Sequence, residues 1–446
     1  MLEGLPIYPP LDAVPFAINQ YTPLFYWLAG GIASFVGVEP GDLDALYRVG
    51  RTISVVSALL LAGALYGAGR RLFDLSPLWS AVASLSVFTG LFPWNVTARS
   101  DCLYLLLGTA AVMAHLRFLR EGRAVWQDCA AALLVLAFFA KQSAIIFAAG
   151  IVVSTLICVP RPLLIHATVP SGAIALAGIG GLLLVLGLGV LDHIVDGVRN
   201  GRDLELMVRR AWLPFVAGKF WLIGAWVMGV IVWWRQGNGD PCIQGLVTIS
   251  TISLVLGAAM SSKFGAAENY FLEFMITASL LAALWCAGIW REKICQTALL
   301  TAVIAVAVFG VNYGFFSGTV DRILNETHVQ AMADAVDIRK NYLGRGERVF
   351  TLDLALILHL KDVAIMPQIS ASLSSAGAGA YDIEPVKTWI ASNPVIAVVE
   401  PAFCGASATN DSWRPDWVDR EFTSLLAGFR HIGELSGGKC VLRGPG

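Results

Sequence analysis

Ten long apolar runs constrain the fold of this 446-residue chain more than any other feature of its sequence. Each run holds 17 to 24 mainly apolar residues, and about 20 such residues in a helix cross a hydrocarbon core of about 30 Å. The predicted spans are Thr52–Gly69, Pro77–Trp94, Asp101–Leu119, Ala124–Ala140, Ser143–Val159, Thr168–Leu191, Ala211–Trp234, Pro241–Met260, Phe271–Trp290 and Cys295–Phe316. The sequence therefore predicts a polytopic α-helical membrane protein.

A further apolar run, residues 21–38, opens with aromatic residues and a proline. Such a start fits a helix that lies in the membrane interface as well as one that crosses the membrane. Both interpretations stand, so the expected number of helices is about 10 to 11.

Composition supports this fold class. Hydrophobic residues make up 57% of the chain and charged residues only 14%, against roughly 25% charged residues in soluble proteins. The formal net charge of −1 provides no basic stripe for the phosphates of a nucleic acid, so we expect no nucleic-acid partner. The expected partner is the lipid bilayer, and the expected location is the plasma (inner) membrane, crossed many times.

The cysteines predict no metal site, because no CxxC pair and no Cys/His ligand spacing occurs. No Asp-rich loop offers oxygen ligands to a divalent ion either. Six of the eight cysteines lie in or beside apolar runs, where they are expected to be buried hydrophobic residues. Cys404 and Cys440 lie in the polar tail and could form a disulfide if that tail is extracytoplasmic.

Basic residues in the short loops predict an orientation. One side holds nine of them: Arg70, Arg71, Arg117, Arg120, Arg123, Arg161, Arg235, Arg291 and Lys293. The other side holds five: Arg48, Arg51, Arg99, Lys141 and Lys263. We expect the first side to be cytoplasmic, provided that the four arginines of the segment 192–210 belong to a long external loop and are left out of the count.

The composition changes after Phe316. Residues 319–344 predict an amphipathic helix, whose apolar side holds Val320, Ile323, Leu324, Ala331, Ala335 and Ile338. The β-rich runs RVFTLD, VAIMP, VIAVVE and KCVLRG then alternate with helical runs, which predicts a small parallel α/β layer. We therefore expect an external loop with an interfacial helix (1–51), a transmembrane domain (52–316), and an amphipathic helix with an extracytoplasmic α/β domain (317–446).

Polar residues gather at span ends on the side predicted to be external. They are Arg99, Asp101, Lys141, Lys263, Glu268, Asn269 and Glu273. If 267–290 is helical, Asn269 and Glu273 share a face, with Tyr270 one position round. This set predicts a polar cavity with two or three cations in reach of one anion, for which phosphate is the obvious candidate.

A simpler interpretation competes for most of these residues. A lysine or arginine at a span end often anchors the helix in the interface, and Asp101 suits the first turn of a helix. Glu273 lies inside an apolar run, where its charge needs a partner. The gathering of these residues, more than any one of them, favours a functional site.

Taken in order, several segments resemble a known family. They are EGLPIYPP, NQYTPLFYWLAG, YRVGRTISVVSALLLAGALYGAGRRLF, ARSDCLYLLL, FFAKQSAIIF and KFGAAENYFLE, which cover most of residues 1–290. The chain resembles GT-C fold integral-membrane glycosyltransferases of the protein-mannosyltransferase and aminoarabinose-transferase type. That resemblance implies transfer of a sugar from a polyprenyl-phosphate carrier, the donor substrate, to a glycan, lipid or protein acceptor at the extracytoplasmic face.

The resemblance also assigns roles. Arg99 and Asp101 correspond to the family's Arg-x-Asp at the start of a span, and Lys141 or Lys263 to its phosphate contacts. Asn269 and Tyr270 correspond to its Asn-Tyr loop, while Glu268 and Glu273 would orient Lys263 or contact the sugar. No cofactor beyond the donor is implied.

One departure concerns the catalytic base. The family pattern places an acidic residue in an external loop ahead of the segment NQYTPLFY, and Glu3 and Asp12, the acids found there, do not fit that position. We expect the base upstream of Met1, with an inactive chain as the alternative. A transporter or lipid flippase and a non-catalytic membrane scaffold are the competing functions.

Overall fold

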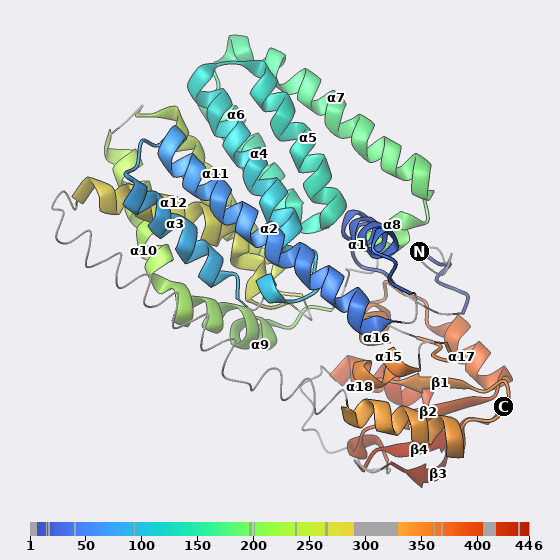
Figure 1. Cartoon of the computed structure of the whole chain (residues 1–446). Coiled ribbons are helices and arrows are strands. Elements are labelled where there is room, and N and C mark those ends of the chain that lie inside the picture. Colours follow the sequence, from blue (N-terminus) through green and yellow to red (C-terminus); the bar gives the residue numbers. More distant parts are fainter. Residues whose placement is uncertain are drawn as a thin grey trace. The chain divides into compact units, whose positions relative to one another are not determined.

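The computed structural model describes residues 7–14, 16, 18–39, 42–92, 94–195, 199, 201–236, 239–263, 266–289, 329–360, 362–366, 369–404, 416–435 and 438–445. The chain divides into two compact units. The helical unit comprises Met1–Gly4, Tyr21–Gly187 and Leu204–Phe316. The α/β unit comprises Leu5–Gln20, Leu188–Asp203 and Ser317–Gly446. Figure 1 shows the elements of both.

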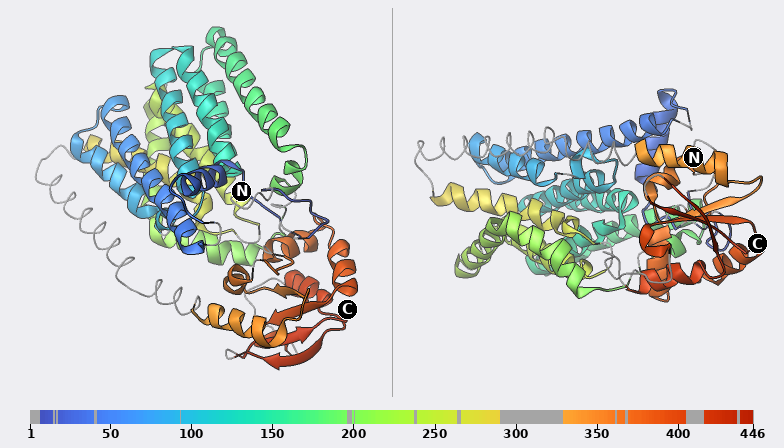
Figure 2. Two further views of the ribbon diagram at one scale, coloured as in Figure 1. Left: turned by 45° about the vertical axis from the view of Figure 1, so that its right-hand side comes forward. Right: turned by 90° about the horizontal axis from the view of Figure 1, so that it is seen from below.

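The helical unit is built from long helices joined by short turns (Figures 1 and 2). Its helices are α1 (Leu24–Phe35), α2 (Leu43–Leu72), α3 (Pro77–Gly90), α4 (Asp101–Glu121), α5 (Ala124–Ala140), α6 (Ile145–Cys158), α7 (Arg161–Leu186), α9 (Leu204–Met207), α10 (Leu213–Gln236), α11 (Pro241–Met260) and α12 (Leu272–Ile289), with short 3₁₀ turns at Trp94–Val96, Gln142–Ala144 and Glu268–Phe271. Their ends follow local chemistry. Asp42, Ser76 and Asp240 accept hydrogen bonds from the first turns of α2, α3 and α11, and Gly122, at φ 69°, ends α4.

Six of the described helices are long and apolar enough to cross a membrane. They are Asp44–Leu72, Asp101–Glu121, Arg161–Leu186, Val208–Ile231, Pro241–Met260 and Glu268–Ala287. The predicted polytopic helical fold is confirmed. The predicted spans at 77–94, 124–140 and 143–159 form the shorter helices α3, α5 and α6, and the predicted span at 295–316 lies outside the described residues.

The predicted bounds of one span, 168–191, are wrong. Helix α7 begins at Arg161 and ends at Leu186. Pro162 suits the first turn of a helix because that turn needs no backbone donor there, and Gly187 ends the helix at φ 77°.

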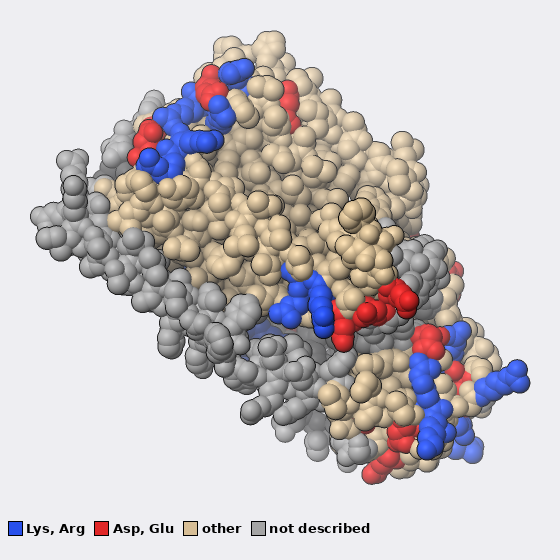
Figure 3. Space-filling view, in the orientation of Figure 1, with Lys and Arg blue, Asp and Glu red and all other residues tan. Residues whose placement is uncertain are grey.

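Helix α2 shows where a membrane fits the helical unit. Arg48 and Arg51 lie near its start, and Arg70 and Arg71 lie in its last turn. The uncharged residues 52–69 between them rise about 27 Å in a helix, close to the thickness of a hydrocarbon core. Figure 3 shows a broad uncharged surface between two groups of charged side chains.

Helices α4 and α12 lie at the centre of the helical unit, and α7 lies at its edge. The membrane-length segments of α4 and α12 are mostly buried, whereas that of α7 is mostly exposed. Helix α4 approaches α6 closely at Gly108, where an added Cβ would overlap the ring of Phe147. His115 of α4 is a fully paired core residue, with Nδ1 2.8 Å from Oε1 of Gln127 and Nε2 2.8 Å from Oγ of Ser154.

The α/β unit holds a four-stranded mixed sheet. Strands β1 (Arg348–Thr351), β2 (Val395–Val399), β3 (Arg430–Glu434) and β4 (Cys440–Arg443) lie in the order β1-β2-β4-β3. Strands β1 and β2 are parallel, while β4 runs antiparallel to both β2 and β3. The predicted parallel layer is therefore wrong for two of the three strand pairings, both of which involve β4. No helix intervenes between β3 and β4, and two strands joined by a short turn pair antiparallel.

Helices cover both faces of this sheet (Figure 2). A helix over 329–337 buries Ala335 and, one turn on, Ile338 against Val349 and Ile396. On the other face, the rings of Phe350 and Phe422 stack, with centroids 5.4 Å apart. Phe422 belongs to α18 (Asp416–Leu425), and the further helices are α8 (Val190–Ile194), α15 (Leu354–His359), α16 (Ile369–Gly377) and α17 (Glu384–Ser392).

This arrangement supports the predicted amphipathic helix in part. Ala331, Ala335 and Ile338 are buried as expected. Val320, Ile323 and Leu324 lie outside the described residues.

His193 of α8 fixes the segment 7–20 within the α/β unit. Its Nδ1 accepts the Asn19 backbone N–H at 3.1 Å, and Nε2 lies 2.8 Å from the Pro9 carbonyl oxygen. The ring is also 5.3 Å from the ring of Tyr8. An accepting Nδ1 requires the neutral imidazole, with its proton on Nε2. Burial lowers the pKa of His193, and the neighbouring Asp192 charge opposes that effect only in part.

We expect acid to weaken this attachment. Because the folded pKa lies below the ordinary value of 6.5, the unfolded state binds more protons, and stability falls as pH falls below 6.5. Thermal unfolding of the full chain between pH 8 and pH 5 would measure this, with His193→Gln as the variant that should lack the component. An identical pH profile in the two proteins would contradict it.

Candidate functional site

Asp101, the first residue of α4, is paired with cations on both sides. Its Oδ2 accepts a hydrogen bond from Arg99 Nε at 2.8 Å, and its Oδ1 accepts one from Lys141 Nζ at 2.6 Å. Asn269 Nδ2 also donates to Oδ1, at 3.4 Å. The side chains of Asp101 and Lys141 are 1% and 6% exposed, so this is a buried ion pair with an arginine at its edge.

The local backbone explains how Asp101 and Lys141 come into contact. Asp101 stands in the first turn of α4, where the positive end of the helix dipole favours a carboxylate. Lys141 has extended backbone angles (φ −162°, ψ 131°) and separates α5 from the Gln142–Ala144 turn. The predicted association of Arg99, Asp101, Lys141 and Asn269 is thus present in the fold.

The surroundings of Lys141 and Arg99 raise the pKa values of both side chains. Burial disfavours the charged form of Lys141, but Asp101, Tyr21 and Tyr270 together outweigh burial and raise the pKa of Lys141. Asp101 and Tyr21 likewise outweigh burial at Arg99 and raise the pKa of its guanidinium. Both groups therefore stay charged at neutral pH.

Two tyrosines at this cluster have no role in the sequence prediction. Arg99 Nη2 donates to the Tyr21 hydroxyl at 3.4 Å, and Lys141 Nζ lies 5.7 Å from the centre of the Tyr21 ring. The ring of Tyr104 lies 5.2 Å from the same Nζ. Aromatic faces at such distances attract a cation. Tyr21 belongs to the segment NQYTPLFYWLAG, which carries part of the family resemblance but predicts no role for this tyrosine.

Lys263 has no carboxylate within ion-pair distance among the described residues. Its Nζ lies 5.1 Å from the centre of the Tyr270 ring. Burial and, to a smaller extent, the nearby Lys141 charge lower its pKa to about 8, with Tyr21 acting in the opposite direction. Of the cations predicted for the site, Lys263 is the one that an incoming anion could neutralise.

The two glutamates expected to orient Lys263 have other partners. Glu268 Oε2 lies 3.2 Å from Lys219 Nζ, and Glu273 Oε1 accepts a hydrogen bond from the Tyr104 hydroxyl at 3.0 Å. The predicted orientation of Lys263 by these carboxylates is therefore wrong, because packing pairs them with helices α10 and α4 instead. Their predicted contact with a sugar stays a prediction.

Glu273 is the more enclosed of the two glutamates. It is 1% exposed, and its Oε2 has no hydrogen-bond partner within the described part of the chain. The 3₁₀ turn Glu268–Phe271 leads directly into α12, so Asn269 and Glu273 lie on one buried face, as predicted. Gly257 of α11 allows the Glu268–Phe271 turn to pack closely against that helix, since an added Cβ would lie 2.4 Å from the Tyr270 carbonyl oxygen.

Lys219 is a site neighbour that the sequence prediction missed. It lies within the apolar segment Val208–Ile231, where an ionisable residue is expensive and marks a functional position by default. The signal was therefore present in the sequence, as the only charged residue of the run LPFVAGKFWLIGAW.

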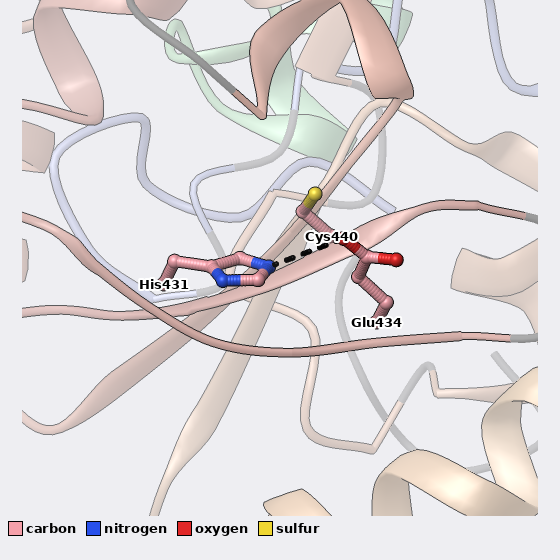
Figure 4. A group of neighbouring side chains, drawn as sticks. All are labelled: His431, Glu434 and Cys440. Carbon is pink, nitrogen blue, oxygen red and sulfur yellow. Dashed lines mark ion pairs between the residues drawn. The ribbon is translucent and has the colours of Figure 1, made fainter.

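One further cluster resembles a metal site by composition but offers no open ligand set. His431, Glu434 and Cys440 lie together in the α/β unit (Figure 4), with His431 Nε2 4.0 Å from Glu434 Oε1. Cys440 forms a disulfide with Cys404, at a Cα–Cα distance of 5.6 Å, so its sulfur is not a thiolate ligand. The suggested Cys404–Cys440 pairing is thereby confirmed.

The candidate site can bind an anion. Arg99, Lys141 and Lys263 supply three positive charges, and Asp101 supplies one negative charge, which leaves the group with a surplus of two positive charges. Ammonium and guanidinium donors bind phosphate through charge-assisted hydrogen bonds. The charges and donors of this cluster therefore suit a phosphate or another multivalent oxyanion.

Comparisons with known proteins identify the fold. No protein-family model matches the chain, and no curated protein matches its sequence. The structure is similar to that of ArnT from Cupriavidus metallidurans in the apo state (TM-score 0.56, 12% identity, 98% of this chain and 89% of ArnT). It is also similar to ArnT bound to undecaprenyl phosphate (TM-score 0.52, 12% identity, 96% and 88%).

A second similar structure is the oligosaccharyltransferase of Archaeoglobus fulgidus in complex with Zn and sulfate. The TM-score is 0.52 at 11% identity, over 85% of this chain and 59% of that one. At such identities the likeness establishes the fold alone. The chain has the GT-C fold, as the sequence resemblance implied.

Proposed function

We propose that this protein is a membrane glycosyltransferase that moves a sugar from a polyprenyl-phosphate carrier to an acceptor. The observation that carries the proposal is the cation cluster of Arg99, Lys141 and Lys263 around Asp101, at the end of α4 in a GT-C fold. Its surplus of positive charge is what a lipid-linked phosphate requires. ArnT, whose fold is similar, binds undecaprenyl phosphate.

The charge of the cluster suits the reaction. A sugar linked to a lipid phosphate is a diester with one negative charge. When the bond from the anomeric carbon to the phosphate oxygen breaks, the leaving lipid phosphate becomes a monoester with a charge of about −1.5 to −2 at pH 7. Cations placed where negative charge grows lower the barrier. Lys263, which has no carboxylate partner among the described residues, is the group proposed to receive most of that charge.

The remaining bond changes follow from a single in-line displacement. The acceptor oxygen attacks the anomeric carbon from the side opposite the phosphate, and the acceptor hydroxyl loses its proton to a carboxylate base. We assign that base to no described residue. The proposed contacts with the phosphate or sugar of the donor are Asn269, Tyr270 and the two glutamates Glu268 and Glu273.

An apolar cavity supports a lipid-linked substrate. It measures about 350 Å³, lies between α5, α6 and α7, and is lined by Phe138 and Ala144 at the end near Lys141. Gln127 and Thr155 line it as well, and the 11 helical residues between Gln127 and Phe138 rise about 16 Å. We propose that the first isoprene units of the carrier occupy this cavity while its phosphate meets the cations.

Filling the cavity should weaken carrier binding without harming the fold. Gly172 of α7 lines the cavity, and an added Cβ there meets nothing within 4 Å. Gly172→Leu is expected to reduce undecaprenyl phosphate affinity about tenfold, because about two buried methylene contacts of about 0.8 kcal/mol each are displaced. Equilibrium binding to the detergent-solubilised protein would measure this.

The matched control lies two turns along the same helix. Gly180 also has nothing within 4 Å of an added Cβ, and it does not line the cavity. Gly180→Leu should leave affinity unchanged. Equal affinities for the two variants would remove the cavity from the proposal.

The expected orientation extends the proposal. Asp101 and Glu121 lie at opposite ends of α4, and the arginines of the loops near Glu121 favour the cytoplasm for that end. The site would then face the extracytoplasmic side of the plasma membrane. The disulfide of the α/β unit favours an oxidising compartment, which supports the predicted extracytoplasmic placement of residues 317–446.

The decisive experiment follows the carrier during turnover. Purified protein in nanodiscs would receive polyprenyl-phosphate sugars and a panel of glycan, lipid and protein acceptors, and release of free polyprenyl phosphate would be measured. Acceptor-dependent release that is lost in Lys263→Ala supports the proposal. Movement of the lipid across the bilayer without release would favour a flippase, and no binding of any polyprenyl phosphate would favour a scaffold.

A further inference from the structure

Lys219 is a charged residue placed on the inward face of a membrane-length helix. Its Nζ lies 3.2 Å from Glu268 Oε2, with side chains 15% and 22% exposed. The backbone of α10 leaves the helical conformation at this residue (φ −138°, ψ 22°). A helix kink has an identifiable local cause, and here the break and the ion pair coincide.

Aromatic packing joins the same face of α10 to the same turn. Phe215, one helical turn before Lys219, stacks on Phe271 with ring centroids 4.4 Å apart. Trp212 meets Phe271 edge-on at 5.7 Å. The Glu268–Phe271 turn is therefore bound to α10 at its first residue by charge and at its last residue by stacking.

The opposite side of this turn meets the candidate site. Asn269 reaches Asp101 Oδ1 at 3.4 Å, and the Tyr270 ring lies 5.1 Å from Lys263 Nζ. The first and last of these four consecutive residues thus contact α10, and the two between them contact the cation cluster. A shift of the turn by a single residue would remove both site contacts.

Lys219 also lies beside the end of α3. A Cβ added at Gly90, the last residue of α3, would lie 3.7 Å from Lys219 Cε and 2.6 Å from Met275 Sδ. The lysine side chain therefore passes a residue that has no side chain of its own.

We propose that Lys219 is a positioning residue, which acts through Glu268 to hold the Glu268–Phe271 turn where Asn269 and Tyr270 complete the phosphate site. The inference rests on the proposed function for the identity of the ligand. A partly buried ion pair adds little to stability compared with apolar packing, so its value lies in fixing position. Lys219 itself contacts no reacting atom in this assignment.

The test compares Lys219→Met and Glu268→Gln with the charge-swapped double variant Lys219→Glu/Glu268→Lys in the full chain. Backbone hydrogen exchange over residues 266–272 reports the turn, and undecaprenyl phosphate affinity reports the site. Each single variant is expected to exchange about tenfold faster and to bind about tenfold more weakly. The double variant should recover both properties.

Arg209→Met provides the control, because Arg209 forms an exposed ion pair with Glu205 ahead of the same helix. It should change neither readout. Unchanged exchange in Lys219→Met would overturn the inference, and so would faster exchange with unchanged affinity. If the unmodified chain bound no undecaprenyl phosphate, the proposed function would fail, while the exchange measurement would still decide whether Lys219 holds the turn.

Discussion

Asp101→Ala is expected to lower the free energy of unfolding of the helical unit by about 3–5 kcal/mol, the usual cost of leaving a buried charge without its partner. The charge left behind is Lys141, whose side chain is 6% exposed and 2.6 Å from Asp101. Carrier binding should be lost in the same variant, because Arg99, Lys141 and Asn269 all take their positions from this carboxylate. Unfolding in mixed detergent micelles and undecaprenyl phosphate binding would measure the two effects.

Two comparisons make this result specific. Glu121→Ala removes an exposed carboxylate at the other end of the same helix, where Arg117 is its partner, and should have a much smaller effect on stability. Asp101→Leu/Lys141→Leu removes the buried charges together and should recover most of the lost stability but none of the binding. A stability loss in Asp101→Ala no larger than in Glu121→Ala would contradict the buried pair.

Lys263→Ala is expected to reduce carrier affinity by about 10- to 100-fold, corresponding to loss of one charged hydrogen bond of about 1.5–3 kcal/mol. Stability should be maintained at pH 7, because Lys263 has no carboxylate partner among the described residues and its charge is disfavoured by burial. Lys263→Arg should keep most of the affinity. The exposed Lys340, changed to alanine, provides a control for loss of positive charge.

The pH dependence of the unmodified protein checks the same assignment. The pKa of Lys263 is lowered from 10.5 to about 8, so the residue loses its charge as pH rises through 8, and carrier affinity should fall there. Stability should change the other way, rising between pH 8 and 10.5, because the unfolded chain binds the proton more tightly. An affinity independent of pH from 7 to 9 would argue against contact between Lys263 and the phosphate.

Local sequence features predicted a large part of this molecule. The apolar runs predicted the helices, because backbone groups in a membrane must form their hydrogen bonds within the segment that crosses it. The charged residues at the ends of these runs predicted the site residues Arg99, Asp101 and Lys141, since ionisable residues avoid the hydrocarbon core. The order of these motifs was enough to recognise the GT-C fold.

Pairing between distant residues could not be predicted in the same way. Glu268 lies five residues from Lys263 in the sequence but pairs with Lys219, and Tyr21 joins Arg99 across 78 positions. The strand β3, with the sequence RHIGE, carries mostly exposed side chains and gave no apolar signal. Its antiparallel place in the sheet depends on pairing with β4.

The sequence by itself thus determined most of the long apolar helices and which polar residues stand at their ends, because burial in lipid acts on each segment separately. Only the tertiary structure decided which carboxylate neutralises which cation, and therefore that Lys263 keeps its charge available to a ligand while Lys219 does not. The physical reason is that an ion pair requires contact within about 4 Å, and the packing of α4, α10 and α12 sets those distances.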